Sequence, residues 1–385
     1  MVHSVDFFRL LLLFVPDEEG VFSVSETDSS QTRDNILFPP LFVKYFSRKK
    51  KTGFYFSDYA SFPLANNRIK EYITGKHQKI CGEAEMEITQ VLNFGSLNID
   101  HVYTVDHFVA PGETLSSAGY LVNAGGKGLN QSVALSRAGV KTLHAGMIGR
   151  EGSFLKETLE SFKVDTRHVI TGDVPTGHAI IQVEKNSAQN SILLYPGANM
   201  AIPLDVMERI LHSMPSGSWL LLQNEINDVP FLIREGKKLG LKVAFNPAPC
   251  SEEVASYPLH LCDLIFVNEI EAAQLTSEQG GHNRLAAAMA ARFPGCEIVV
   301  TLGKEGAVWR RGSEEIFVPA VPVKAVDTTS AGDTFTGFFL AAKLRGMTPL
   351  ESMKHAVLAS SITVSRHGAA ISIPAAEEVF DAENY

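Results

Sequence analysis

Strand-like and helix-like runs alternate along the chain from Met86 onward, and this pattern limits the possible folds more than any other feature. Short apolar runs such as KVAFN (residues 242–246) and LIFVN (residues 264–268) are typical of strands, whereas VPFLIREGKKLGL (residues 229–241) is typical of a helix. Apolar strands that alternate with helices predict a mainly parallel sheet with helices on both faces. Ligand sites in such sheets lie at the carboxyl ends of the strands.

Two stretches interrupt the alternation, at about residues 101–124 and 175–199. Each has the pattern of a β ribbon with turn residues between its strands. We expect them to form a small separate sheet, a lid over the main one. Residues 86–385 are therefore predicted to form one α/β domain, which opens with an alternating β pattern that ends at Gly95.

The first 85 residues have a different character. They contain ten of the 23 phenylalanines but only four of the 30 glycines, and they show no sustained helix or strand period. The basic run SRKKK (residues 47–51) is more simply a solvated surface run than a nucleic-acid site. We expect this stretch to be poorly ordered or not part of the natural protein, whose start we place at Met86. A genuine disordered or targeting extension is the alternative.

Charge and composition argue against several classes of protein. The net charge of −9 disfavours nonspecific binding to nucleic acid or to an anionic membrane. The apolar run within the first 20 residues is too short to cross a bilayer, and its flanks do not fit a signal peptide. The four cysteines form no CxxC pair and are typical of free thiols in a reducing compartment. We therefore predict a cytoplasmic location.

The stretch AVDTTSAGDTF (residues 325–335) joins a strand-like run to a helix-like run. Small residues at the start of a helix leave backbone N–H groups free to bind phosphate oxygens. Asp333, in the first helical turn, would lie close to such a phosphate and could accept a proton from a hydroxyl group that attacks phosphorus. The alternative is that Asp333 merely caps an ordinary helix.

Other polar groups follow strand-like runs. Asn98 and Asp100 are two residues apart, so an extended segment points both to one side, where an amide and a carboxylate suit a polyol. Glu225 ends an apolar run and would be costly to bury unless it meets ligand hydroxyls. The pair Gly125-Gly126 allows close backbone approach to a small ligand. The alternative for Asn98 and Asp100 is the polar edge of a strand. The alternative for Gly125-Gly126 is a simple turn that joins a strand to a helix.

Two further motifs could serve a nucleotide. Asn268 and Glu271 lie three residues apart at a predicted helix start, where they could hold a hydrated Mg²⁺ ion near phosphates or simply form a capping motif. TLGKEG (residues 301–306) follows a strand-like run and is either a nucleotide-side loop or a tight turn. The 12 histidines do not cluster with metal-ligand spacing, and we expect most of them at the surface.

Taken in order, the motifs GSLNID, AGGKGLNQ, NPAP, NEIEA, TLGKEG and DTTSAGD resemble the ribokinase (PfkB-type carbohydrate kinase) family. The resemblance runs from about Met86 to Pro374. It implies a three-layer sandwich, in which a mainly parallel sheet is flanked by helices and carries a small β-sheet lid. It also implies a homodimer joined through the lids.

The resemblance assigns roles by position. Asp333 would take the proton of the sugar's 5-hydroxyl, beside an anion hole formed by the N–H groups of Ala331, Gly332 and Asp333 itself. The implied sugar contacts are Asn98, Asp100, Gly126, Lys127, Asn130, Glu225 and Asp333. The implied nucleotide contacts are Asn268, Thr301, Leu302, Gly303, Lys304, Glu305, Gly306, Gly332 and Asp333.

The same resemblance implies two metal ions. Glu271 would act on Mg²⁺ through water. A K⁺ site would set the shape of the anion-hole loop, with Asp327, Thr329, Thr363, Arg366, Gly368 and Ser372 as its residues. The chain departs from the family at Ser330, where many relatives have glycine, and at Phe338, where the family usually has a small residue.

The function that the resemblance implies is ATP-dependent phosphorylation of D-ribose at the 5-hydroxyl, which gives D-ribose 5-phosphate. Mg²⁺ would be required and K⁺ would activate. Asn98, Asp100 and Glu225 favour ribose as the sugar. Two alternatives stay open: another kinase of the family, acting on a keto-sugar, a deoxyribose or a nucleoside, and a catalytically silent sugar-binding regulator.

Overall fold

The computed structural model describes residues 90–187, 189–278 and 280–381. The chain divides into two units, and the second, Met86–Tyr385, contains the fold described below. The expectations for residues 1–85, including a natural start at Met86, fall outside the described residues.

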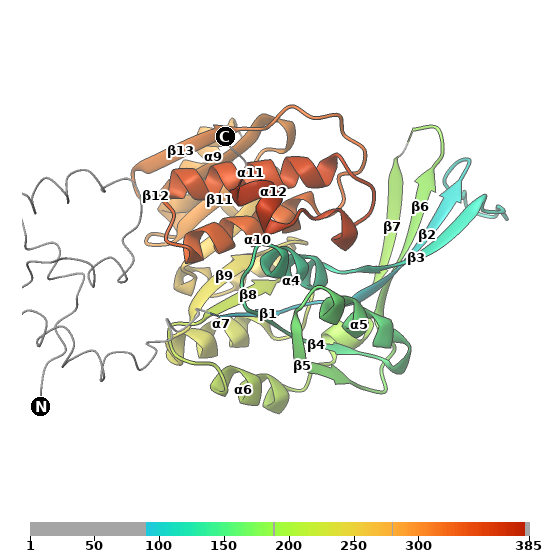
Figure 1. Ribbon diagram of the computed structural model, residues 1–385, viewed down its shortest axis with the longest axis horizontal. Coiled ribbons are helices and arrows are strands. Elements are labelled where there is room, and N and C mark those ends of the chain that lie inside the picture. The colour runs from blue at the N-terminus through green and yellow to red at the C-terminus, as the bar shows by residue number, and fades with distance from the viewer. Residues whose placement is uncertain (1–89, 188, 279, 382–385) are drawn as a thin grey trace, which may run out of the picture. The chain divides into compact units, whose positions relative to one another are not determined.

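A nine-stranded sheet forms the centre of this unit, in the order β13-β12-β11-β10-β9-β8-β1-β4-β5 (Figure 1). Neighbouring strands from β5 to β11 pair in parallel, whereas β12 and β13 pair antiparallel at one edge. The strands are β1 (Val91–Phe94), β4 (Thr142–Ile148), β5 (Asp165–Thr171), β8 (Trp219–Gln223), β9 (Lys242–Asn246), β10 (Leu264–Asn268), β11 (Glu297–Thr301), β12 (Gly306–Arg311) and β13 (Glu314–Pro319).

Helices cover both faces of the large sheet. One face packs against α6 (Leu204–His212), α7 (Val229–Lys238), α8 (Glu269–Thr276) and α9 (His282–Arg292). The other packs against α4 (Lys127–Arg137), α5 (Ser153–Ser161), α10 (Ala331–Leu344), α11 (Pro349–Val364) and α12 (Ala376–Phe380). Short 3₁₀ turns join them: η2 (Arg150–Gly152), η3 (Gly197–Met200), η4 (Glu252–Ser256), η5 (Leu259–Leu261), η6 (Gly303–Glu305) and η7 (Ala370–Ser372). The predicted three-layer sandwich is confirmed.

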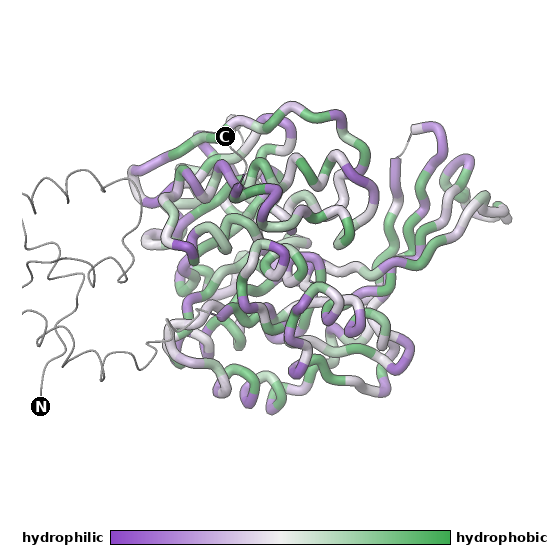
Figure 2. Tube along the Cα trace, in the orientation of Figure 1, coloured by the Kyte–Doolittle hydropathy of each residue, from purple (hydrophilic) through white to green (hydrophobic). Residues whose placement is uncertain are grey.

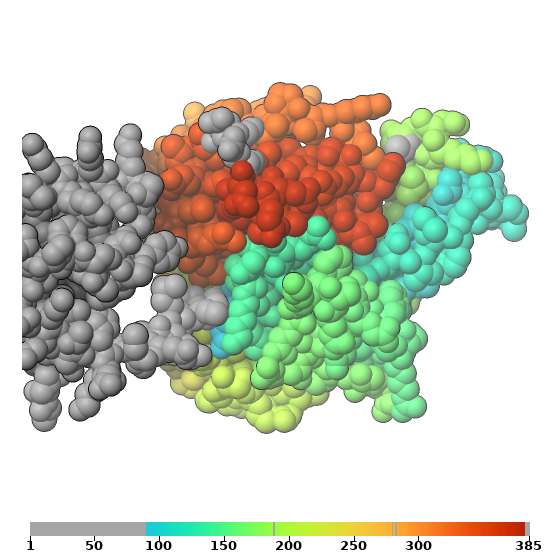
Figure 3. Space-filling view, viewed as in Figure 1, coloured from blue at the N-terminus to red at the C-terminus, as the bar shows by residue number. Residues whose placement is uncertain are grey.

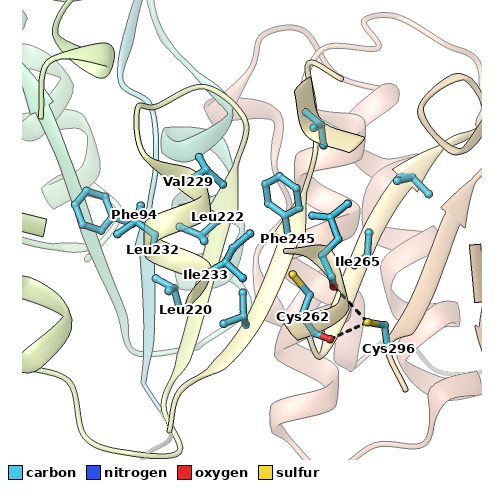
Figure 4. Packing of buried hydrophobic residues seen from close by; sticks show 14 of the residues in the cluster. Phe94, Leu220, Leu222, Val229, Leu232, Ile233, Phe245, Cys262, Ile265 and Cys296 are labelled. Carbon is cyan, nitrogen blue, oxygen red and sulfur yellow. Dashed lines mark hydrogen bonds between the residues drawn. The ribbon is translucent and has the colours of Figure 1, made fainter. Parts of the chain in front are cut away.

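The core on the first face is apolar and continuous. Leu232 and Ile233 of α7 lie over the strand residues Leu220 and Leu222, and all four side chains are fully buried (Figure 4). On the opposite face, α10 packs against both α4 and α11. In the space-filling view, the red part of the chain lies directly against the teal segment that contains α4 (Figure 3). The large sheet is therefore a rigid base, on which the polar strand ends can be held in place.

The strand β1 is buried on both faces, as the predicted cover of helices on both sides of the sheet requires. All four of its residues, including Asn93, are buried. The physical reason is its place between β8 and β4 in the middle of the sheet, where helices cover both faces. The polar side chain of Asn93 thus points into the protein and meets its hydrogen-bonding needs there.

A second, four-stranded sheet has the order β3-β2-β6-β7 and extends beyond the sandwich (Figure 1). Its strands are β2 (Asn98–Val105), β3 (Gly119–Gly125), β6 (Gly177–Glu184) and β7 (Asn190–Tyr195), so the two predicted β ribbons are present. Apolar residues run along these strands (Figure 2), and Leu121 and Leu193 are 64% and 68% exposed. The register pairs Asn98 with both Gly125 and Gly177, so three lid strands have an end on one line.

Phe338, a departure from the family pattern, is fully buried in the core on the α10 face. Its ring stacks on that of Phe380 in α12, with 5.8 Å between ring centres. The guanidinium of Arg345 lies 4.0 Å from the centre of the Phe380 ring, on which it makes a cation–π contact. The large side chain at residue 338 therefore fixes the last helix against α10.

Among the described residues, no helix is long and apolar enough to cross a membrane. Cys250, Cys262 and Cys296 are free thiols, as predicted, and Cys81 falls outside the described residues. Cys296 donates a hydrogen bond to the carbonyl of Cys262 (Figure 4).

Candidate active site

The start of α10 has the geometry of an anion-binding site. Ser330 precedes the helix in the left-handed conformation, at φ 62°, and its carbonyl accepts the first helical hydrogen bond, from the Thr334 amide. The Ala331 amide donates to the Thr328 carbonyl at 3.3 Å. Among the described residues, the amides of Gly332 and Asp333 have no such partner. A Cβ atom at Gly332 would meet nothing within 4 Å, so the space beside its Cα atom is open, and the first-turn amides lack the partners that later turns have.

Asp333 is buried in the first turn of α10, and both of its carboxylate oxygens accept hydrogen bonds. Asn130 donates to Oδ2 at 3.2 Å and Gln131 donates to Oδ1 at 2.9 Å. Both donors come from α4, which runs beside α10. The helix cap that sequence left open as an alternative is absent, since no side-chain cap bond is made at the start of α10.

Asn98 and Asp100 lie at the base of the lid strand β2. Asn98 is buried and its Oδ1 accepts a hydrogen bond of 2.7 Å from Asn199. The Asp100 carboxylate lies against Gly125, where a Cβ atom would come within 2.0 Å of its Oδ2. Burial, together with the nearby charge of Glu225, raises the pKa of Asp100 to about 7. Gly125 is thus required as glycine, so that the two lid strands can enclose a carboxylate.

Glu225 follows β8 and faces the start of α4. Its carboxylate accepts hydrogen bonds from the Ser96 hydroxyl and, at 3.1 Å, from the Lys127 amide. Burial raises its pKa, although the Lys127 ammonium opposes that change. Gly126 caps α4 at φ 96°, and a Cβ atom there would lie 3.0 Å from the Ser96 carbonyl, so glycine permits the close packing of these two backbone segments. Its predicted approach to a ligand stays a prediction.

Lys127 connects the parts of the site electrostatically. Burial alone lowers the pKa of its ammonium, but the carboxylates of Asp333, Glu225 and Glu271 together shift the pKa upward. The Lys127 ammonium is therefore close to one carboxylate predicted for catalysis, one predicted for the sugar and one predicted for Mg²⁺. It offsets part of the negative charge that these three carboxylates would otherwise carry together.

Asn130 leaves one polar atom without a partner. Its Nδ2 donates a hydrogen bond to Asp333, whereas its Oδ1 is buried and has no hydrogen-bond donor among the described residues. An orphaned acceptor costs free energy unless a ligand supplies a donor. A sugar hydroxyl is a donor of the required kind.

Asn268 and Glu271 form a complete capping box at the start of α8. The Glu271 amide donates to the Asn268 side chain, and the Asn268 amide donates to the Glu271 carboxylate, both at 2.9 Å. The capping alternative therefore holds. It does not exclude the predicted role with Mg²⁺, because the carboxylate still has free lone pairs, although burial raises its pKa and so disfavours the ionised form.

The loop at residues 301–306 follows β11. Its residues from Gly303 to Glu305 form the exposed turn η6, and the Leu302 amide bonds to the Gly306 carbonyl. Gly306 has φ 122°, and a Cβ atom would lie 2.1 Å from the Val318 carbonyl. The loop is thus a tight turn whose exposed end lies just past β11, at the edge of the sheet where ligands bind.

Asp327 joins the two segments predicted for K⁺. Its Oδ1 accepts from the Thr329 amide at 2.9 Å and its Oδ2 accepts from the Gly368 amide at 3.1 Å. Thr363 donates or accepts a side-chain hydrogen bond with Thr334 of α10, at 3.0 Å. The remaining predicted residues, Arg366 and Ser372, lie in the same loop and in η7. Carboxylate, carbonyl and hydroxyl oxygens are ligands that suit a hard cation.

Another acidic cluster lies outside the site. Glu208, His212 and Glu235 have ligand atoms within 4.8 Å of one another, on α6 and α7. Glu235, however, accepts two hydrogen bonds from the Lys238 ammonium. Because that ammonium already neutralises the carboxylate, we assign no ion to this group.

Sequence reasoning missed the residues behind the site. Gln131, Gln223, Asn93, Ser132 and His144 form a buried chain of hydrogen bonds that ends at Asp333. The expectation that most histidines lie at the surface is wrong for His144, which is fully buried and whose burial lowers its pKa to about 3. One signal was available, since Asn93 and Gln223 are polar residues within otherwise apolar strand runs.

Comparison with known proteins identifies the family. The family model described as "pfkB family carbohydrate kinase" matches residues 88–376. The chain belongs to this family. A ribokinase of Haemophilus influenzae is 36% identical over 295 residues, which cover 74% of this chain and 96% of that protein. A deoxyribokinase of Salmonella typhi is 34% identical over 295 residues, which cover 74% of this chain and 95% of that protein.

Solved structures agree with this assignment. The ribokinase of Arabidopsis thaliana, in a structure with ribose and ATP, has a TM-score of 0.68 and 28% identity, with 76% of this chain and 98% of that chain covered. The chain is thus an enzyme, a kinase of the ribokinase type, and the predicted ribokinase-like fold is confirmed.

Proposed function

We propose that this enzyme transfers the γ-phosphoryl group of ATP to the 5-hydroxyl of D-ribose. The observation that carries the proposal is the start of α10, where the buried carboxylate of Asp333 lies beside the two unpartnered amides of Gly332 and Asp333. A proton acceptor next to an anion hole suits the attack of a hydroxyl on phosphorus. The ribokinase structure with ribose and ATP supports both substrates.

The reaction follows from these positions. Asp333 accepts the proton of the 5-hydroxyl while the oxygen forms a bond to the γ-phosphorus and the bond from phosphorus to the β,γ-bridging oxygen breaks. The amides of Gly332 and Asp333 donate to the phosphoryl oxygens and stabilise their charge, and Lys127 adds a positive charge nearby. Mg²⁺, when bound, would neutralise phosphate charge, with Glu271 orienting its water ligands.

The sugar would bind between the lid and the start of α4. Asn98, Asp100, Glu225 and the free Oδ1 of Asn130 offer acceptors to its hydroxyls. Lys127 and Gly126 would complete that pocket. The nucleotide would lie over the exposed turn η6 and near Asn268, at the carboxyl end of β11.

A cation site and a dimer belong to the same proposal.

A monovalent cation, K⁺, would bind at Asp327 and hold the turn that precedes α10. One exposed apolar face of the lid would pair with a second copy, because the strand register places Leu193, Ile180 and Val122 on the same face, where they are 68%, 38% and 45% exposed. Sedimentation of the Leu193→Asp variant tests the pairing: we expect a monomer, and an unchanged dimer would rule out this surface.

A sugar panel with ADP detection tests the function. Purified protein is given ATP with ribose, 2-deoxyribose, fructose, adenosine or no sugar, each with K⁺ and with Na⁺. We expect ribose to give the highest kcat/KM, with K⁺ faster than Na⁺. A higher kcat/KM for 2-deoxyribose would instead favour the activity named for the Salmonella relative. If no sugar led to ADP formation, the protein would instead be the catalytically silent sugar-binding regulator.

A further inference from the structure

We propose that Gln131 is a positioning residue for Asp333, and that a fixed series of buried side-chain amides determines which end of Gln131 faces the carboxylate. This inference rests on the proposed role of Asp333 as the base. Gln131 is fully buried, and its Nε2 donates to Asp333 Oδ1 at 2.9 Å, opposite the bond from Asn130 to Oδ2. With one donor on each oxygen, the carboxylate cannot rotate without breaking a bond.

The orientation of Gln131 matters because its amide has two different ends. An ionised carboxylate only accepts hydrogen bonds, so the NH₂ group must face Asp333 and the carbonyl must face away. Gln131 Oε1 accepts from Gln223 Nε2 at 2.7 Å, which fixes that carbonyl. Gln131 would otherwise be free to turn its oxygen toward Asp333 and repel it.

Gln223 is fixed in turn by Asn93. Its Nε2 also donates to Asn93 Oδ1, at 2.9 Å. The NH₂ group of Asn93 donates to the Gly128 carbonyl at 2.7 Å and to the Ser132 hydroxyl at 2.8 Å. Because a backbone carbonyl only accepts, the Gly128 carbonyl sets the direction of every amide between it and Asp333.

The series begins in the buried centre of the large sheet. Asn93 lies in the central strand β1, Gln223 ends the neighbouring strand β8, and Gln131 lies on α4. All three side chains are fully buried. The NH₂ group of Gln131 also donates to Asn246, at the end of β9, with 3.3 Å between Gln131 Nε2 and Asn246 Oδ1. The orientation of Asp333 is thus tied to the carboxyl ends of three adjacent strands, although Asp333 itself lies on α10.

The arrangement also requires glycine at residue 95. A Cβ atom there would lie 2.2 Å from Gln223 Oε1. Gly95 therefore leaves the room in which Gln223 turns its NH₂ group toward Asn93 and Gln131. This is a physical reason for glycine in a motif that follows β1, separate from any contact with substrate.

The test compares Gln131→Met with wild-type protein. Methionine keeps the length and volume of the side chain but cannot donate to Asp333. We expect kcat to fall by about 10- to 100-fold, the range of one hydrogen bond to a charged group. The KM values for ribose and ATP should change by less than about threefold, since Gln131 contacts neither substrate in this proposal. The acidic limb of the kcat profile against pH should move to higher pH, because the ionised carboxylate has lost a donor.

Two further variants make the test specific. Gln223→Met removes the donor that fixes Gln131 and leaves Gln131 intact, so it should shift kcat and the pH profile in the same direction. Ser136→Ala, on the same helix, deletes the hydrogen bond from Ser136 to the Phe162 carbonyl and serves as the matched control for α4. It should leave kcat and its pH profile unchanged. If Gln131→Met does not fold, Gln223→Met decides by the same two measurements.

The outcomes separate this inference from the proposed function. If Asp333→Asn loses activity but Gln131→Met and Gln223→Met keep the wild-type kcat and pH profile, the positioning role is wrong and the base stands. If Asp333→Asn retains the wild-type kcat, the proposed function itself fails. A fall in kcat with no change in the pH profile, in both variants, would also overturn the positioning role and leave a general structural effect.

Discussion

Asp333 and Asp100 are both carboxylates at the proposed sugar position, but their surroundings are opposite. Asp333 accepts side-chain hydrogen bonds on both oxygens, from Asn130 and Gln131. Asp100 accepts none from the described residues, and its pKa is raised to about 7 by burial and by Glu225. Both oxygens of Asp333 have a hydrogen-bond donor without any ligand, whereas those of Asp100 lack the donors that a polyol would supply. The difference fits the roles proposed above, chemistry for Asp333 and binding for Asp100.

The largest effect on activity should come from substitution of Asp333, whose carboxylate has a donor on each oxygen. Asp333→Asn keeps the size of the side chain and removes its capacity to accept a proton. We expect kcat to fall by about 10²–10⁴-fold, the usual loss when a general base is removed. Ribose and ATP should still bind, which calorimetry with each substrate can measure. A variant that lost binding and kept its rate at saturation would reverse the contrast between the two carboxylates.

Substitution of Asp100 should affect binding instead. Asp100→Asn weakens an acceptor that a sugar hydroxyl would use, at a cost of about 1–3 kcal/mol, so the ribose KM should rise by about 5- to 150-fold. The ATP KM should stay near its wild-type value. Asp106→Asn is the matched control, since Asp106 lies just beyond the same strand and is exposed. Equal rises in both KM values would mean that Asp100 is structural.

The pH dependence of binding sharpens the same contrast. The pKa of Asp100 is raised above its unfolded value, so its ionised form is lost as the pH falls through about 7. If the ionised form binds the sugar, the ribose KM should rise by about tenfold between pH 8 and pH 6. In Asp100→Asn the KM should be nearly constant over this range. A wild-type KM that fell on acidification would contradict the sign.

A third carboxylate, Asp327, gives the smallest expected effect. Its carboxylate accepts hydrogen bonds from two backbone amides rather than from side chains. It lies six residues before Asp333, in the same stretch of residues 325–335. We expect Asp327→Ala to abolish the difference in rate between K⁺ and Na⁺, while the rate in Na⁺ stays close to wild type. Equal rates of the wild-type enzyme in the two salts would remove the cation site altogether.

The sequence predicted the layers and the lid because burial follows hydrophobic periodicity. It also indicated candidate site residues, because they follow strands as family motifs, and their roles stay predictions. It could not predict the support behind them. Gln131 stands next to Asn130 in the same motif, yet its role depends on Gln223, 92 residues away, and on Asn93, which lies 130 residues from Gln223. Such long-range polar pairings have no local pattern.

The register of the lid has a mechanical consequence. Asn98 pairs with Gly125 and Gly177, so three lid strands are attached to the sandwich along one line, next to the proposed sugar contacts. A strand of the length of β2, eight residues, extends about 26 Å from that line. A rotation of about 10° at the base would therefore displace the tip by about 4.5 Å. The lid would act as a lever that turns about the proposed sugar pocket, and small changes in how that pocket closes would be amplified at the far end of the lid.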